Sequence, residues 1–104
     1  MAQIILTAAE RRAHRADAHH LDPVVHIGTD GLTPAVLKEI DAALNAHGLI
    51  KVRVFNDERS EREAMYLRVA EELAAAPVQH IGKLLVLWRP IPEKHKAADE
   101  DRMP

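Results

Sequence analysis

The sequence predicts one α/β domain, in which three helices pack on a mixed four-stranded sheet in the order α-β-α-β-α-β-β. Helical and strand patterns alternate along residues 1–90, and the last two strand patterns follow one another directly. Helices between strands favour crossover connections, whereas two consecutive strands favour an antiparallel pair. With 104 residues, 47% of them apolar and none of them Cys, the chain holds enough apolar material for one core without disulfides.

The first predicted helix spans residues 7–19, because Thr7 and Glu10 have the spacing of a capping box. Its apolar side consists mainly of alanines, so we expect it to pack weakly. Pro23 ends the helical pattern, since a proline forces the residue before it toward extended geometry. Residues 24–27, Val-Val-His-Ile, then form a short predicted strand.

The second predicted helix follows Thr33, a typical N-cap residue, and starts at Pro34, whose missing N–H would have no partner there. It ends before Gly48, a typical C-terminal stop. Its apolar side chains recur at helical spacing and form one predicted buried stripe: Val36, Leu37, Ile40 and Leu44.

The second predicted strand, residues 49–55, alternates between apolar and other side chains. Because successive side chains of a strand point to opposite faces, one face of this strand is predicted to be dry and the other cationic. The dry face comprises Ile50, Val52 and Val54, and the other comprises Lys51, Arg53 and Phe55.

The third predicted helix starts near Ser60 and Glu63, which have the spacing of a second capping box. An apolar pattern at helical spacing follows, and Pro77 ends it. This pattern comprises Tyr66, Val69, Ala70, Leu73 and Ala74.

The last two predicted strands, residues 78–81 and 83–89, are separated by Gly82, which indicates a bend or a tight antiparallel pair. The second of them is almost entirely apolar, so we expect it at the centre of the sheet. The predicted domain therefore spans residues 1–90. Residues 91–104 are charged and nearly free of large apolar side chains, so we expect a disordered tail there.

The composition excludes several classes of function. The absence of Cys excludes disulfide scaffolds, thiolate zinc sites and Cys nucleophiles, and it is compatible with a reducing compartment, so we expect a cytoplasmic protein. There is no secretory signal pattern and no apolar run near the ~18 residues that span a bilayer, so we expect no membrane partner. Acidic and basic residues nearly balance, 16 against 14, so any argument for nucleic acid depends on local arrangement.

A strand, a Gly-x-x-Gly loop and a helix follow one another at Gly28, Thr29, Asp30 and Gly31. Two glycines allow a tight turn and a close approach of the main chain, and the helix start presents unpaired N–H groups with a partial positive charge. A phosphate fits such a place, and KH domains clamp single-stranded nucleic acid with a loop of this kind. An ordinary strand-to-helix turn is the alternative, and the charge of Asp30 disfavours phosphate.

The second candidate site is the cationic strand face, Lys51 and Arg53 with Phe55 in line. If the last strand lies alongside, Arg89 extends this basic row and Lys83 stands at its other end. The alternative is a solvated strand face, since Lys and Arg also protect strands from edge pairing.

The seven histidines do not predict a metal centre, because no HExxH occurs and His14, His19 and His20 lack the i, i+4 spacing of a helical zinc site. No Ser-His-Asp order indicates a nucleophilic site. We therefore expect no metal, no cofactor and no catalytic residue, so the protein is predicted not to be an enzyme.

Five segments combine into a pattern more specific than any single motif. In order they are HxLxPVV at residues 19–25, GxxGLT at 28–33, VLxEI at 36–40, ALxxHxLIKV at 43–52 and VQxIGKxLVL at 78–87. With this order and spacing, the chain resembles the CRM domain, in its stand-alone bacterial form of the YhbY type, over nearly all of the predicted domain.

The resemblance implies a fold similar to the C-terminal domain of translation initiation factor 3 and a non-catalytic RNA-binding function. It implies that the protein associates with ribosomal RNA in large-subunit precursors, assists ribosome assembly and contacts RNA through residues 28–31. We expect RNA as the partner, no DNA, and a monomer. The alternative is a protein-interaction module that binds a basic ribosomal protein or assembly factor, which the net charge of -2 favours.

Overall fold

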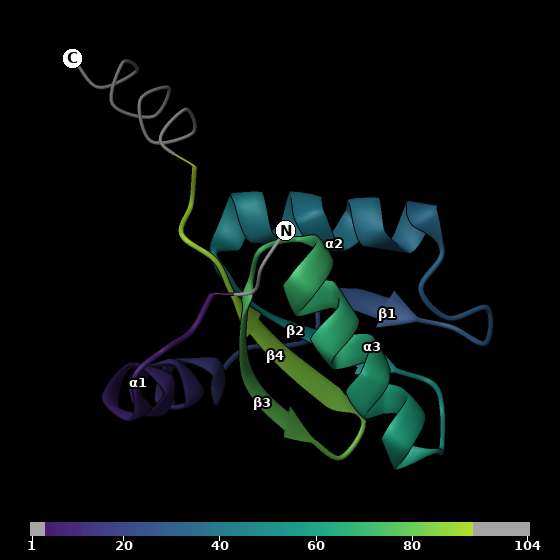
Figure 1. Cartoon of the computed structure of the whole chain (residues 1–104), viewed down its shortest axis with the longest axis horizontal. Helices are drawn as coiled ribbons and strands as arrows, with labels where there is room; N and C mark the ends of the chain where they lie inside the picture. The colour runs from purple at the N-terminus through teal and green to yellow at the C-terminus, as the bar shows by residue number, and fades with distance from the viewer. Residues whose placement is uncertain (1–3, 93–104) are drawn as a thin grey trace.

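The computed structural model describes residues 4–92, and Figure 1 shows their arrangement. The helices are α1 (Ala8–Ala18), α2 (Pro34–His47) and α3 (Arg59–Glu72), and the strands are β1 (Val25–Ile27), β2 (Leu49–Val54), β3 (Ala76–Ile81) and β4 (Leu84–Trp88). This order confirms the predicted α/β fold with three helices and four strands. Most of the predicted tail, residues 91–104, lies outside the described residues, and the domain boundary stays a prediction.

The four strands form one mixed sheet in the order β1-β2-β4-β3. Strand β1 runs parallel to β2, with Ile27 opposite Val54, and α2 makes the crossover between them. Strand β4 lies between β2 and β3 and is antiparallel to both. The expected antiparallel pair and the expected central position of the last strand are therefore confirmed.

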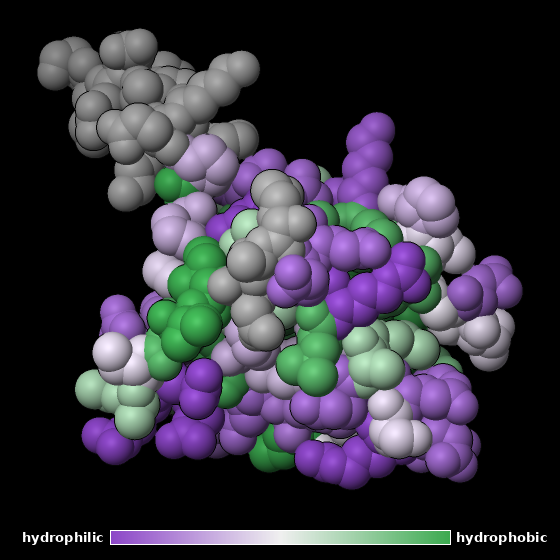
Figure 2. Space-filling view, in the orientation of Figure 1, coloured by the Kyte–Doolittle hydropathy of each residue, from purple (hydrophilic) through white to green (hydrophobic). Residues whose placement is uncertain are grey.

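The two faces of the sheet carry separate buried clusters. Helices α2 and α3 cover one face, and the larger cluster lies beneath them, with Ile40, Leu44, Val52 and Leu87 fully buried. Helix α1 contacts the other face over β2, β3 and β4. The smaller cluster beneath it comprises Leu6, Ala18, Ala76, Val78 and Val86, with Ile4, Leu49 and Trp88 packed against it. Figure 2 shows that the outer side, over α3, is mainly hydrophilic with scattered hydrophobic areas.

The caps of α1 and α2 confirm two sequence predictions. The hydroxyl of Thr7 accepts a hydrogen bond from the Glu10 amide at 3.1 Å, and the Glu10 carboxylate accepts one from the Thr7 amide at 2.9 Å. The hydrogen bond from the Thr7 amide to the carboxylate lowers the pKa of Glu10. The Thr33 hydroxyl accepts from the Val36 amide at 3.2 Å. Both helices therefore start where their N-cap residues predict.

The start of α3 corrects a third prediction, because Ser60 lies inside the helix and forms no capping box. The side-chain oxygen of Asn56 accepts from the Glu58 amide at 2.8 Å, which turns the chain into the helix earlier than expected. Glu63, the expected second member of the box, instead bonds Nδ1 of His80 at 2.6 Å. A tertiary contact thus replaces the local contact that the spacing predicts.

Candidate nucleic-acid interface

The loop at residues 28–31 is a tight turn that projects beyond the end of β1 (Figure 1). The Gly31 amide donates to the Gly28 carbonyl at 3.1 Å and closes the turn. Gly31 has φ +73°, a left-handed conformation that side chains rarely adopt, so the turn itself requires glycine there. Gly28 has no positive φ, and a Cβ added to it would meet nothing within 4 Å. The geometry of an ordinary turn therefore accounts for the glycine at position 31. It does not account for the glycine at position 28, where a side chain would fit.

The hydrogen-bond donors of this region lie mostly in the loop rather than in the helix. Within residues 4–92, the amides of Thr29 and Asp30 at the tip of the turn donate to no other group. The first turn of α2 offers less than the sequence indicates, because Pro34 has no N–H and Thr33 already accepts from the Val36 amide. An anion at this place would be held mainly by the loop amides.

The cationic face of β2 is arranged as the alternation predicts. Val52 and Val54 are fully buried, whereas Lys51 is half-buried and Arg53 and Phe55 are exposed. Neither Lys51 nor Arg53 forms an ion pair within the part of the chain that the structure describes. Two cations are therefore available on this face of the sheet.

His26 joins this face from the neighbouring strand. It lies directly opposite Arg53 in the β1–β2 register, and it is exposed between buried Val25 and Ile27. Its ring stacks beside Phe55 with 5.9 Å between ring centroids and 19° between planes, and the Arg53 guanidinium carbon lies 5.3 Å from the Phe55 centroid. We call His26, Arg53 and Phe55 the platform. His26 was not among the predicted site residues, although its position between two apolar residues of a predicted strand indicates an exposed side chain.

The platform adjoins the loop. The Phe55 amide donates to the carbonyl of Ile27 at 2.9 Å, and Ile27 immediately precedes Gly28. Helix α1 covers the opposite part of this sheet face, near Leu49 and Trp88. The platform and the loop therefore form one continuous exposed region at the ends of β1 and β2.

Arg89 lies elsewhere, which corrects the expected basic row. It shares the sheet face of Leu87, beneath α2 and α3, and its side chain is only 14% exposed. Its guanidinium forms an ion pair with Asp41 at 2.8 Å and donates to the carbonyl of Leu73 and the side chain of Asn45. Arg89 thus joins two helices to the sheet and does not extend the row of Lys51.

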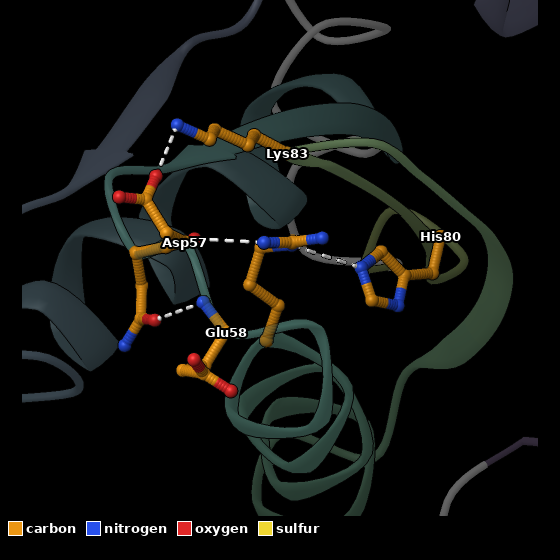
Figure 3. A network of polar contacts seen from close by, with 6 residues as sticks. Asp57, Glu58, His80 and Lys83 are labelled. Atoms are coloured by element: carbon orange, nitrogen blue, oxygen red, sulfur yellow. Dashed lines mark hydrogen bonds and ion pairs between the residues drawn. The ribbon is translucent and has the colours of Figure 1, made fainter.

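Lys83 lies at the same end of the sheet as the loop, and its positive charge is paired with a carboxylate. Its carbonyl accepts from the Val54 amide at 2.8 Å, which places the β3–β4 turn beside the end of β2. Its ammonium bonds the Asp57 carboxylate at 2.6 Å (Figure 3). This hydrogen bond and the positive charge lower the pKa of Asp57. The pair leaves less free positive charge at this place than the sequence indicates.

A buried arginine holds the β2–α3 loop against the hairpin. Arg62 is 7% exposed, and it donates to the Asn56 carbonyl at 2.8 Å and to Nε2 of His80 at 3.4 Å (Figure 3). Because Nε2 accepts this bond, Nδ1 of His80 donates to Glu63. The network keeps Asp57 and Lys83 beside the end of β2. His80 therefore has a structural role that its sequence position did not reveal.

Two further classes of site are not found among residues 4–92. This part of the chain contains no cluster of three or more side chains suited to a metal ion. It also contains no helix long and apolar enough to cross a membrane.

Comparisons with known proteins agree with this geometry. The model of the CRS1 / YhbY (CRM) domain family matches residues 6–89. An RNA-binding protein of Haemophilus influenzae is 44% identical over 88 residues, which are 85% of this chain and 89% of that protein. A probable RNA-binding protein of Pseudomonas aeruginosa is 36% identical over 91 residues, 88% of each chain. The solution structure of a hypothetical Staphylococcus aureus protein, described as an RNA-binding candidate, matches with a TM-score of 0.77 and 31% identity over 86% of this chain and 93% of that one.

Proposed function

Because the chain belongs to the CRS1 / YhbY (CRM) domain family, we propose that it is a non-catalytic RNA-binding protein that uses residues 28–31 and the exposed face of β2. The observation that carries this proposal is Gly28. The fold does not require a glycine there, and the missing side chain lets an RNA phosphate approach the free amides of Thr29 and Asp30.

The charges on the sheet complete the proposed interface. Lys51 and Arg53 lie on the strand beside the loop and have no carboxylate partner within residues 4–92, so their charges are free to neutralise phosphates. The net charge of -2 does not oppose this, because many carboxylates lie on the exposed sides of the helices, away from the strand face. Local charge, not total charge, governs contact with the RNA backbone.

The RNA that we propose is ribosomal RNA in large-subunit precursors, and the proposed role is to assist ribosome assembly in the cytoplasm as a monomer. This part of the proposal is supported by the likeness to the CRM family. Crosslinking in cells followed by sequencing of the bound RNA tests it. Recovery of large-subunit precursor segments is the expected result, and recovery of unrelated messenger RNA alone would contradict it.

The loop is tested at Gly28 rather than at Gly31, because a substitution at Gly31 strains its left-handed backbone and unfolds the turn for local reasons. We expect Gly28→Ala to keep or raise the melting temperature, since it restricts the unfolded chain at a site with room for a Cβ. We expect Gly28→Asp to weaken binding of large-subunit precursor RNA, because it adds a negative charge beside the phosphate.

The matched control is Ala9→Asp, which adds the same charge in the exposed first turn of α1, over the opposite part of the sheet. Filter binding and thermal denaturation are measured on all three variants. Folded Gly28→Asp that binds precursor RNA with the parent's Kd would show that the loop is only a turn.

A second candidate function is recognition of a basic protein, and one groove favours it. The groove lies between α1 and β2, and it combines carboxylates with apolar side chains: Asp17, Asp22, Leu21, Val24 and Leu49. This combination suits a segment that carries both basic and apolar residues. Pull-down before and after RNase treatment separates the two functions, because only a protein partner stays bound after the RNA is removed.

A further inference from the structure

We propose that Phe55, with His26 and Arg53 beside it, stacks on one unpaired RNA base, so that the RNA bound here carries a single-stranded segment. This inference rests on the proposed function and adds the structural class of the RNA. It concerns stacking on the ring of Phe55, whereas the proposed function depends on the loop and on the charges of Lys51 and Arg53.

The Phe55 ring is more exposed than the other two aromatic rings of the chain. Tyr66 is buried, and Trp88 is half-buried against the ring of His14, with 4.5 Å between ring centroids. Phe55, the third of the three aromatic residues, is 47% exposed and belongs to neither buried cluster. A ring that stabilises no core is free to contact a ligand through its face.

His26 and Arg53 surround the Phe55 ring with groups that also stack on bases. The His26 ring is nearly parallel to Phe55, at 19°, and the Arg53 guanidinium lies 5.3 Å from the Phe55 centroid. Two rings and a guanidinium group thus form one exposed cluster, in which the positive charge lies over the Phe55 ring. Stacking on aromatic rings and on arginine planes is the common way in which proteins hold unpaired bases.

Phe55 lies beside the loop at residues 28–31. Phe55 is hydrogen-bonded through its amide to Ile27, directly before the loop proposed to hold phosphate. A strand of RNA whose backbone follows the loop therefore brings its bases to the platform. In a continuous duplex the faces of the bases are covered by their neighbours, so only an unpaired base can stack on Phe55.

The test uses a short single-stranded RNA that carries 2-aminopurine, whose fluorescence is quenched when it stacks, and the duplex of the same sequence. The parent and Phe55→Trp are expected to prefer the single strand and to quench the probe. Phe55→Leu removes the ring and keeps an apolar side chain. We expect it to lose the quenching and to raise Kd for the single strand about tenfold, ~1.4 kcal/mol.

The salt dependence separates stacking from charge contacts. Because no phosphate contact is removed, the log–log salt slope of Phe55→Leu should equal that of the parent. Leu67→Ala is the matched control, since Leu67 is 43% exposed on α3 and lies beside β3, at the opposite edge of the sheet from β1 and the platform. Its Kd and quenching should not change.

The outcomes separate the two proposals. If the parent binds the single strand and Phe55→Leu keeps both its Kd and its quenching, the platform is excluded and the proposed function stands. Equal affinity of the parent for single strand and duplex also overturns the platform. If the parent binds neither these probes nor precursor RNA, the proposed function fails and the platform fails with it.

Discussion

The two faces of the sheet differ in what their side chains do, although the same strands build both. Beneath α2 and α3 the strands present a continuous apolar surface. The arginine on this face, Arg89, forms an ion pair within the protein. On the other face, α1 covers only part of the sheet, and His26, Arg53 and Phe55 stay exposed beside the loop. The first face holds the fold together, and the second is available for a partner.

The comparison teaches that the face on which a cation lies decides its role more than its type does. Arg53 lies in β2, and Arg89 directly follows the neighbouring antiparallel strand β4. One is exposed without an ion pair within residues 4–92, and the other is 14% exposed and bound to Asp41.

The largest expected effect is on the covered face. Leu44 is fully buried between α2 and the sheet, so Leu44→Ala should lower the free energy of unfolding by ~2–5 kcal/mol. Urea denaturation measures this loss. At a temperature where the variant is folded, its Kd for RNA should match the parent's. A change in Kd without unfolding would show that the two faces are coupled.

The two arginines should respond in opposite ways. Arg89→Met leaves the carbonyl of Leu73 and the side chain of Asn45 without their donor, so we expect a loss of ~1–3 kcal/mol in unfolding free energy. Arg53→Met should change that free energy by less than ~0.5 kcal/mol, because Arg53 is exposed. Only Arg53→Met should weaken RNA binding. The reverse pattern would refute the assignment of the two faces.

The salt dependence of RNA binding counts the cations of the exposed face. If Lys51 and Arg53 each neutralise one phosphate of a single strand, the double change to Ala should reduce the log–log slope by ~1.4, at ~0.7 per contact. Titrations at several salt concentrations measure the slope. An unchanged slope would mean that neither side chain touches a phosphate.

A smaller gain is expected at the loop. Asp30 is exposed and forms no hydrogen bond or ion pair with the described residues. Asp30→Lys should therefore strengthen RNA binding and steepen the salt slope by ~0.7, since it replaces repulsion by attraction. Fluorescence anisotropy measures both quantities. Weaker binding by a folded variant would contradict the placement of phosphate at this loop.

The smallest expected effect concerns the pair at the hairpin. Asp57→Asn frees the charge of Lys83 and should raise RNA affinity about twofold or less, because exposed pairs are weak. In the parent, the hydrogen bond and the positive charge of Lys83 hold the pKa of Asp57 below the ordinary value of an aspartate. The stabilisation by this pair is therefore present above that ordinary value and is lost as pH falls through the lowered pKa. Melting temperatures of parent and variant should converge there.

Much of the fold followed from local sequence. The capping box of Thr7 and Glu10, the N-cap Thr33 and the alternation in β2 each depend on residues close in the chain, and the structure confirms all three. The spacing of Ser60 and Glu63 predicted a cap that does not form. Glu63 bonds His80, which is distant in sequence, and spacing within a helix contains no information about such a partner.

By itself, the sequence determined the fold class, the exposed cations of β2 and the likeness to an RNA-binding family, because strand periodicity, helix caps and motif spacing are local properties of the chain. Only the tertiary structure decided which face Arg89 occupies. Because β4 is apolar on both faces, its sequence has no alternation that would show which face is buried beneath α2 and α3. The pairing of Lys83 with Asp57 and the meeting of His26 with Phe55 likewise depend on strand register. Register is set by the packing of the whole sheet, and no short segment specifies it alone.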